Sequence, residues 1–163
     1  MVTLVFSTDS SFVARAIRFF TRSRCSHVMI GLELEGIPVL LHSTAGGVQV
    51  TPRRLWFKSN RMVDEYRIRP EVDVRAAAEK LGQRYDYVAL IGYALLIVAW
   101  RWFRVKVKNV LASPGAVVCS EFVLELDRGG DLIVEWRGLD PERTHAQDLL
   151  AICERSPGSF ERV

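Results

Sequence analysis

The chain has few cysteines and histidines, and no spacing joins them into a disulfide or metal framework. It has 163 residues, of which three are cysteine and three are histidine. An odd cysteine count excludes a full disulfide framework, and no CxxC pair indicates zinc. The histidines also lack the helical spacing of zinc peptidases. We therefore expect reduced thiols and no metal or organic cofactor. The six residues are Cys25, Cys119, Cys153, His27, His42 and His145.

A charge excess of one sign is also absent. The net charge is only +3, with 22 basic and 19 acidic residues spread along the chain. This balance excludes the strong electrostatic footprint of a nucleic-acid-binding protein. The N-terminal stretch "MVTLVFSTDSS" lacks a basic segment and a cleavage site, so it predicts a strand rather than a signal peptide. We expect a cytoplasmic protein, with membrane association as an alternative.

No apolar run reaches the roughly 20 residues that a membrane-spanning helix needs. The longest run, "YVALIGYALLIVAW", starts at Tyr87 and predicts a buried or interfacial helix. A basic and aromatic cluster from Arg101 to Lys108 follows it directly. The cluster fits a solvated helix end and loop. The alternative is a peripheral membrane contact by the whole segment between Tyr87 and Lys108.

The order of patterns predicts one α+β domain over residues 1–163, with an antiparallel sheet covered by helices. Alternating or β-rich stretches predict strands near 2–7, 27–34, 37–44, 48–52 and 61–69. Helical spacing predicts helices over 12–21, 53–59, 72–82 and 119–127. Thr144 and Gln147 fit a capping box that opens a last helix, "HAQDLLAIC". The final "GSFERV" predicts a short strand or a tail.

The stretch "SRCSHVMIG" places Cys25 two residues before His27, which resembles a local nucleophile and base. If both lie on one strand, their side chains are parallel neighbours roughly 6–7 Å apart at the backbone. A base must point at its nucleophile from about 3 Å away. Strand geometry therefore argues against this pair, and Cys25 is expected to be a small buried residue.

Cys119 lies in a different setting, in "VVCSEFV" after the Pro114-Gly115 loop. It is predicted to open a helix, whose free N–H groups and dipole favour a thiolate and can hold an oxyanion. The alternative is a buried structural cysteine. A base must come from elsewhere in the fold. His27 and His42 lie on neighbouring predicted strands, where one imidazole can act as base while the other orients it.

Four segments in order, "SHVMIG", "VLLHSTAGGVQV", "YDYVALIG" and "VVCSEFV", resemble the circularly permuted papain-like hydrolases. This group includes YiiX-like relatives of the NlpC-type cell-wall peptidases and the lecithin:retinol acyltransferase-like proteins. In its permuted members the histidine strands precede the cysteine helix, as they do here. The resemblance extends from His27 to the C-terminus and implies a permuted papain-like (NlpC-type) fold from a bacterium or phage.

By this resemblance Cys119 is the nucleophile, His27 the general base and His42 the third, orienting residue. Tyr85 is a candidate to donate to an oxyanion, with an amphipathic helix-start residue as the alternative. Ser120 and Glu121 lie next to the nucleophile. Glu121 is expected either to cap the first turn or to bind a cationic substrate group, and Ser120 to be a first-turn residue.

These residues predict a thiol hydrolase that cleaves a peptide, isopeptide or amino-acid amide bond through an acyl-enzyme. Its substrate would be a small peptide, a cell-wall fragment or an acyl or lipid compound. One alternative keeps the thiol but transfers an acyl chain, as the lecithin:retinol acyltransferases do. Another is a non-catalytic binding module on the same fold. The oligomeric state cannot be inferred from the sequence.

Overall fold

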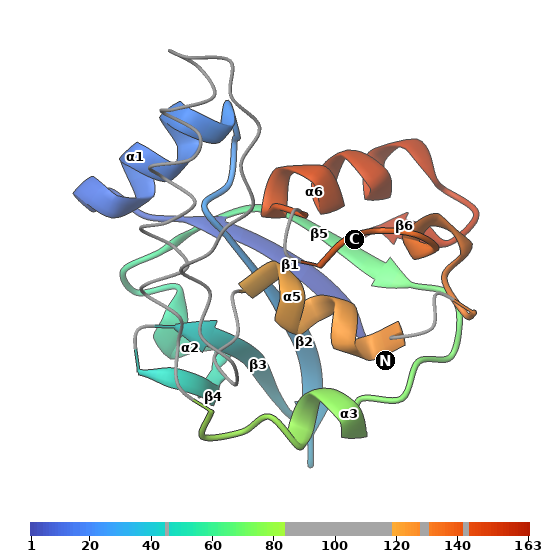
Figure 1. The fold of residues 1–163 in the computed structure, drawn as a ribbon. Coiled ribbons are helices and arrows are strands. Elements are labelled where there is room, and N and C mark those ends of the chain that lie inside the picture. Colours follow the sequence, from blue (N-terminus) through green and yellow to red (C-terminus); the bar gives the residue numbers. More distant parts are fainter. Residues whose placement is uncertain (45, 84–118, 128–130, 142–143) are drawn as a thin grey trace.

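The computed structural model describes residues 1–44, 46–83, 119–127, 131–141 and 144–163. Their centre is a six-stranded antiparallel sheet with the order β4-β3-β2-β1-β5-β6 (Figure 1). Five strands come from the first half of the chain and the sixth from the C-terminus. The strands are β1 (Thr3–Thr8), β2 (His27–Leu34), β3 (Ile37–Thr44), β4 (Gly47–Pro52), β5 (Arg61–Ile68) and β6 (Phe160–Arg162).

The helices are short, and most lie on one face of the sheet. They are α1 (Phe12–Thr21), α2 (Arg53–Trp56), α3 (Arg75–Ala78), α5 (Cys119–Leu124) and α6 (Ala146–Arg155). Two 3-10 turns, η1 (Glu125–Asp127) and η2 (Val134–Trp136), complete the described elements. The prediction of an α+β chain with an antiparallel sheet is therefore confirmed.

The turn between β2 and β3 follows directly from its sequence. Glu35 and Gly36 both have positive φ angles, 50° and 79°, as a two-residue hairpin turn requires. Leu34 pairs with Ile37, and the register runs back to Ile30 opposite Leu41. A hairpin thus joins the strands predicted near 27–34 and 37–44, and it decides which residues of β2 and β3 share a face.

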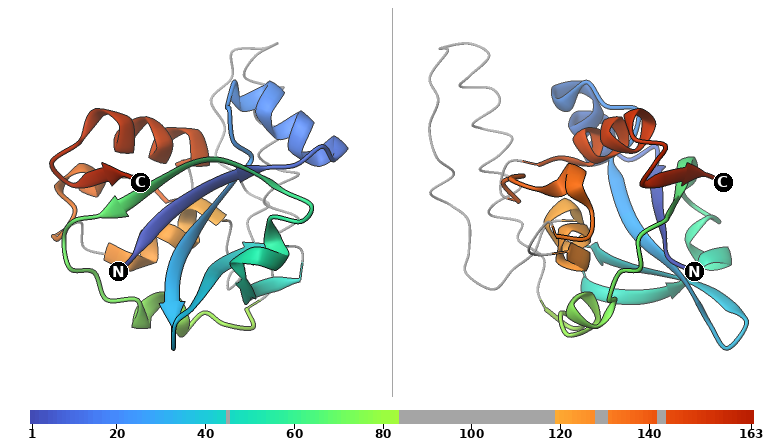
Figure 2. Two further views of the ribbon diagram at one scale, coloured as in Figure 1. Left: turned by 180° about the vertical axis from the view of Figure 1, so that it is seen from behind. Right: turned by 90° about the vertical axis from the view of Figure 1, so that its right-hand side faces the viewer.

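Side chains alternate between the two faces of the sheet, and each face has its own core. The larger core contains Phe6, Val28 and Ile30 of the sheet together with Phe122 of α5. We call this side the α5 face. The opposite side, the α2 face, has a smaller core in which Val5, Met29 and Leu40 pack against Trp56 and Phe57. Figure 2 shows α5 and α2 on opposite sides of the sheet in the view turned by 90°.

Three predicted helix boundaries were wrong. The helix predicted over residues 53–59 ends at Trp56. The helix predicted over residues 72–82 is helical only from Arg75 to Ala78, and Gly82 has a positive φ angle of 81°. The last helix begins one residue later than the predicted capping box implies. His145 is its N-cap, and Asp148 rather than Gln147 accepts a hydrogen bond from the N-cap backbone at 2.8 Å. Both Gln and Asp side chains can accept this capping hydrogen bond. The sequence spacing alone therefore did not distinguish Thr144 from His145 as the N-cap.

Candidate functional site

The two candidate histidines lie together on the α2 face. His27 is the first residue of β2, and His42 is near the end of β3. Continuing the observed register by one step places His42 opposite Met29, on the face that His27 shares. Their ring centroids are 5.7 Å apart, with an angle of 84° between the ring planes. The predicted pairing of the two imidazoles on one face is thus present.

A tryptophan that the sequence did not single out covers both imidazoles. The ring of Trp56 stacks on His27 with centroids 5.3 Å apart, and meets His42 edge-on at 4.5 Å. Its indole Nε1 donates to the hydroxyl of Ser7 at 3.3 Å. Trp56 belongs to the short helix α2, and no periodicity in the sequence indicates against which part of the sheet that helix packs.

Helix α2 is held to the sheet by an ion pair. Both terminal nitrogens of Arg53 donate to the carboxylate of Glu65, at 2.7 and 2.6 Å. The hydroxyl of Thr3 donates to the same carboxylate at 2.9 Å. Bidentate arginine–carboxylate pairs have a well-defined geometry. This one orients α2 so that Trp56 lies over the histidines.

Burial keeps both imidazoles neutral. It lowers the pKa of His27 to about 3, and the neighbouring His42 adds to this effect. Burial alone lowers the pKa of His42 to about 4. His42 Nε2 is 2.9 Å from the hydroxyl of Thr51. Within the described part of the chain, His27 Nε2 and His42 Nδ1 are buried without a hydrogen-bond partner.

Cys119 lies on the other face of the sheet, as the first described residue of α5. It belongs to the apolar core that includes Val28, and α5 packs against β2 and β3. Burial raises the pKa of the Cys119 thiol to about 11, although the nearby backbone of Val28 acts in the opposite direction. Since Val28 follows His27 directly, the thiol and the imidazole flank the same end of β2 from opposite sides.

The structure therefore brings together two of the three predicted catalytic residues and separates the third from them. His27 and His42 share the α2 face, whereas Cys119 is on the α5 face. Ser120 is buried beside Cys119, and Glu121 is half-buried in the same turn. Tyr85 and the segment from Tyr87 to Lys108 lie outside the described residues.

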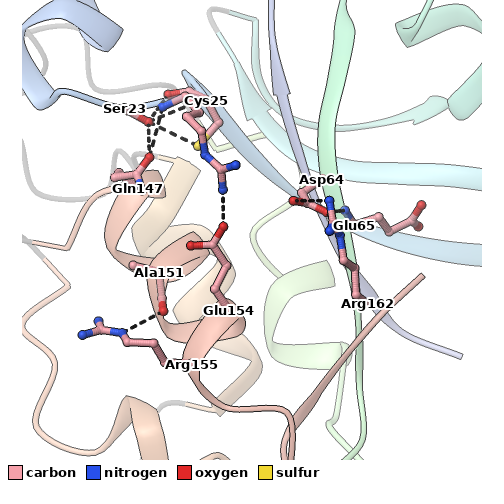
Figure 3. Close-up of polar contacts among 10 residues, drawn as sticks. Ser23, Cys25, Asp64, Glu65, Gln147, Ala151, Glu154, Arg155 and Arg162 are labelled. Atoms are coloured by element: carbon pink, nitrogen blue, oxygen red, sulfur yellow. Dashed lines mark hydrogen bonds and ion pairs between the residues drawn. The ribbon is translucent and has the colours of Figure 1, made fainter.

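Cys25 and its neighbours contact helix α6. Its thiol is 3.4 Å from the hydroxyl of Ser23, which also donates to Gln147 of α6 at 3.0 Å (Figure 3). The neighbouring Arg24 forms an ion pair with Glu154. Burial raises the pKa of the Cys25 thiol, and its side chain joins the core of the α5 face. These contacts attach the loop before β2 to α6, as expected for a small buried residue.

No metal-binding cluster is present in the part of the chain that the structure describes, where no three His, Cys, Asp or Glu side chains form a group. None of the described helices is long and apolar enough to cross a membrane.

Comparison with solved structures identifies the type of fold. The chain is similar to the metalloprotein YiiX from Escherichia coli O157:H7, DUF1105, with a TM-score of 0.51 and 18% sequence identity. The match covers 81% of this chain and 65% of YiiX, so the chain spans just under two thirds of that structure. No family model and no curated protein matches the sequence. The chain thus has a YiiX-like α+β fold, and the likeness extends to the fold alone.

Proposed function

We propose that the chain is a thiol hydrolase on a permuted papain-like fold, with Cys119 as nucleophile, His27 as general base and His42 as the residue that orients His27. The observation that carries this proposal is the packing of α5, which begins at Cys119, against β2, which begins at His27. Residues far apart in the sequence thereby flank the same end of β2, on opposite faces of the sheet. The nearby pair of imidazoles adds support.

The reaction needs only a thiol, an imidazole and water. The proton of the Cys119 thiol passes to His27, and the thiolate attacks the carbonyl carbon of an amide. The C–N bond then breaks, and the amine leaves with the proton from the imidazolium. A thioester joins the acyl group to Cys119 until water, deprotonated by His27, attacks its carbonyl carbon. The C–S bond breaks, and the proton returns to the thiolate.

Turnover requires a rearrangement, because thiol and imidazole lie on opposite faces and both are neutral. The end of β2 is suited to such a change. In the described structure, β3 pairs with β2 only from Ile30 to Leu34, so His27 pairs on one side alone, with Ser7 of β1. Its Nε2 also has no hydrogen bond there to lose on moving, within the described residues. We propose that substrate binding at this end brings His27 to the side of Cys119.

The YiiX structure is named a metalloprotein, which raises the question whether the residues of this chain fit a metal. The buried nitrogens of His27 and His42 offer two imidazole ligands at most, since His42 Nε2 is engaged with Thr51. A zinc site uses three or four protein ligands. The described residues supply no third His, Cys, Asp or Glu to this pair. They do not fit a metal centre, and no step is assigned to one.

The test is a panel of amide, isopeptide and ester substrates, with mass spectrometry of the protein to detect an acyl group on Cys119. Wild-type protein should turn over at least one substrate and carry the acyl group. Cys119→Ser should abolish both, and His27→Gln should slow acylation by a factor on the order of 10² to 10⁴. Cys153→Ser, a buried cysteine in α6, is the matched control and should retain activity. Full turnover by Cys119→Ser would exclude the proposed nucleophile.

A second candidate is a non-catalytic binding module. The separation of Cys119 from His27, with both groups neutral, favours it. In that case His27 and His42 are packing residues of the α2 face, and no acyl group forms on Cys119 with any substrate.

The acyltransferase alternative rested on the segment from Tyr87 to Lys108, which lies outside the described residues. Transfer of the acyl group to an added amine or alcohol instead of water would support it.

A further inference from the structure

The indole of Trp56 lies over both candidate histidines and covers one face of His27. Its ring plane is inclined by 29° to that of His27, so the two rings stack, with centroids 5.3 Å apart. Toward His42 the angle is 68° and the separation 4.5 Å, which makes this an edge contact. Stacked and edge-to-face aromatic pairs are each favourable beyond the area they bury. Trp56 thus contacts both imidazoles in a favourable geometry.

Among the described residues, ring contacts rather than hydrogen bonds hold the side chain of His27. Its Nε2 is buried without a described partner. Its other ring contact is the edge-on one with His42, at 5.7 Å. The backbone of His27 pairs on one side alone, with Ser7 of β1. Displacing the indole would therefore remove one of the two described ring contacts that fix the direction of this imidazole.

Helix α2, which carries Trp56, is attached to the sheet largely through polar contacts. It has four residues, none of them fully buried, and it packs on β3 and β4 (Figure 1). The ion pair between Arg53 and Glu65 is one attachment, and the hydrogen bond from the indole Nε1 to Ser7 is another. The amide of Asn60 donates to the carbonyl of Trp56 at 2.9 Å. The described core of the α5 face includes no residue of α2, so the helix can shift while that core stays intact.

We propose that Trp56 is a positioning residue whose indole holds His27 on the α2 face, away from Cys119. The consequence for Cys119 rests on the proposed function. If His27 must leave the α2 face to reach the thiol, the stacked indole opposes that movement. Removing the ring should therefore speed the reaction of Cys119, whereas loss of a residue that supports an assembled site slows it. This opposite sign separates Trp56 from the proposed roles of His27 and His42.

The experiment measures the histidines and the thiol in the same variants of the full chain. Diethyl pyrocarbonate reports the accessibility of each imidazole and iodoacetamide the reactivity of each cysteine, both at pH 7 with mass spectrometry of peptides. In wild type His42 is fully buried and His27 Nε2 is covered, so both should react slowly. Trp56→Ala should speed modification of both imidazoles by a factor on the order of 10 and alkylation of Cys119 about fivefold.

The matched variants separate the ring from its helix. Trp56→Phe keeps a ring over the imidazoles and should stay close to wild type. Leu55→Ala removes a 46% exposed apolar side chain from the same helix and should behave like wild type. Glu65→Gln weakens the ion pair of α2 but leaves the ring in place, so it should give an intermediate increase. In the double variant Trp56→Ala, His27→Gln the gain at Cys119 should disappear, because the gain acts through His27.

Alkylation of Cys153, which is buried in α6, reports general unfolding. If Trp56→Ala unfolds the chain, Trp56→Leu and Glu65→Gln decide the question, since each removes less buried surface. The proposal is overturned if the imidazoles of a folded variant react no faster than those of wild type, or if the gain at Cys119 persists in the double variant. It is also overturned if His27→Gln slows Cys119 alkylation but loss of the indole does not speed it. Faster imidazoles, with Cys119 alkylation unchanged by His27→Gln, would sink the hydrolase and support the positioning of His27 by Trp56.

Discussion

The two faces of the sheet surround the same strand with different chemistry. On the α5 face, Cys119 lies in a large apolar core, and burial raises the pKa of its thiol to about 11. On the α2 face, the described core has three fully buried apolar residues beside two histidines, and burial lowers the pKa of His27 to about 3. Each environment favours the neutral form of its candidate catalytic group. Neither face therefore holds its candidate catalytic group in the ionised form near pH 7.

The largest effect is expected from breaking the apolar core of the α5 face. Phe122 is fully buried there, so Phe122→Ala should destabilise the protein by about 3–5 kcal/mol through lost burial and a residual cavity. Phe12→Ala is the matched control, since that side chain is 84% exposed and its removal should cost little. Urea unfolding measures the change in stability of each variant. Equal effects would contradict the assignment of the core.

A smaller effect is expected from protonating the α2 face. His42 binds a proton in the unfolded chain below a pKa of about 6.5, but in the folded chain only below about 4. The contribution of neutral His42 to the folding stability is therefore fully present above pH 6.5, and it is lost progressively as the pH drops toward 4. At pH 5 the loss from His42 is about 2 kcal/mol.

Urea unfolding of wild type and of His42→Gln at pH 7 and pH 5 measures this loss. The variant should lose less stability between the two pH values, because it keeps only the contribution of His27. An identical pH dependence in both proteins would contradict the buried, neutral state of His42.

The smallest effect is expected from the hydroxyl that contacts His42. Thr51→Val removes the hydrogen bond to Nε2 and leaves both nitrogens of a buried ring without a described partner, which should cost about 1 kcal/mol. Thr51→Ser keeps the hydroxyl and should be close to neutral. Thermal unfolding resolves the two variants. If Thr51→Ser were the more destabilising one, packing of the methyl group rather than the hydrogen bond would stabilise this position.

Much of the sheet could be predicted from the sequence, because each strand has a strong local signal. The Glu35-Gly36 turn fixes the hairpin register and thereby the shared face of His27 and His42. The position of Cys119 could not be predicted in the same way. Alternation along a strand distinguishes its two faces, but it does not tell which face a distant helix will cover.

Trp56 shows the same limit for a local segment. Its short helix follows β4 directly, yet its place over the histidines depends on the ion pair between Arg53 and Glu65, which are on different elements.

Cys25 and His27 lie on opposite faces of the sheet, although only Ser26 separates them in the sequence. The chain is irregular here, where the Ser26 N–H donates to the carbonyl of Ser7 just before β2 begins.

The most direct test of the central claim is the pH dependence of Cys119 alkylation by iodoacetamide, measured for each cysteine by mass spectrometry. A thiol with a pKa of about 11 is ionised in only about one molecule in ten thousand at pH 7. A small population with His27 beside the thiol would therefore dominate the rate. If His27 serves Cys119, alkylation at pH 7 is faster than that of Cys25 or Cys153, and His27→Gln slows it at least tenfold. A rate that rises only toward pH 11 and is the same in His27→Gln would contradict the claim.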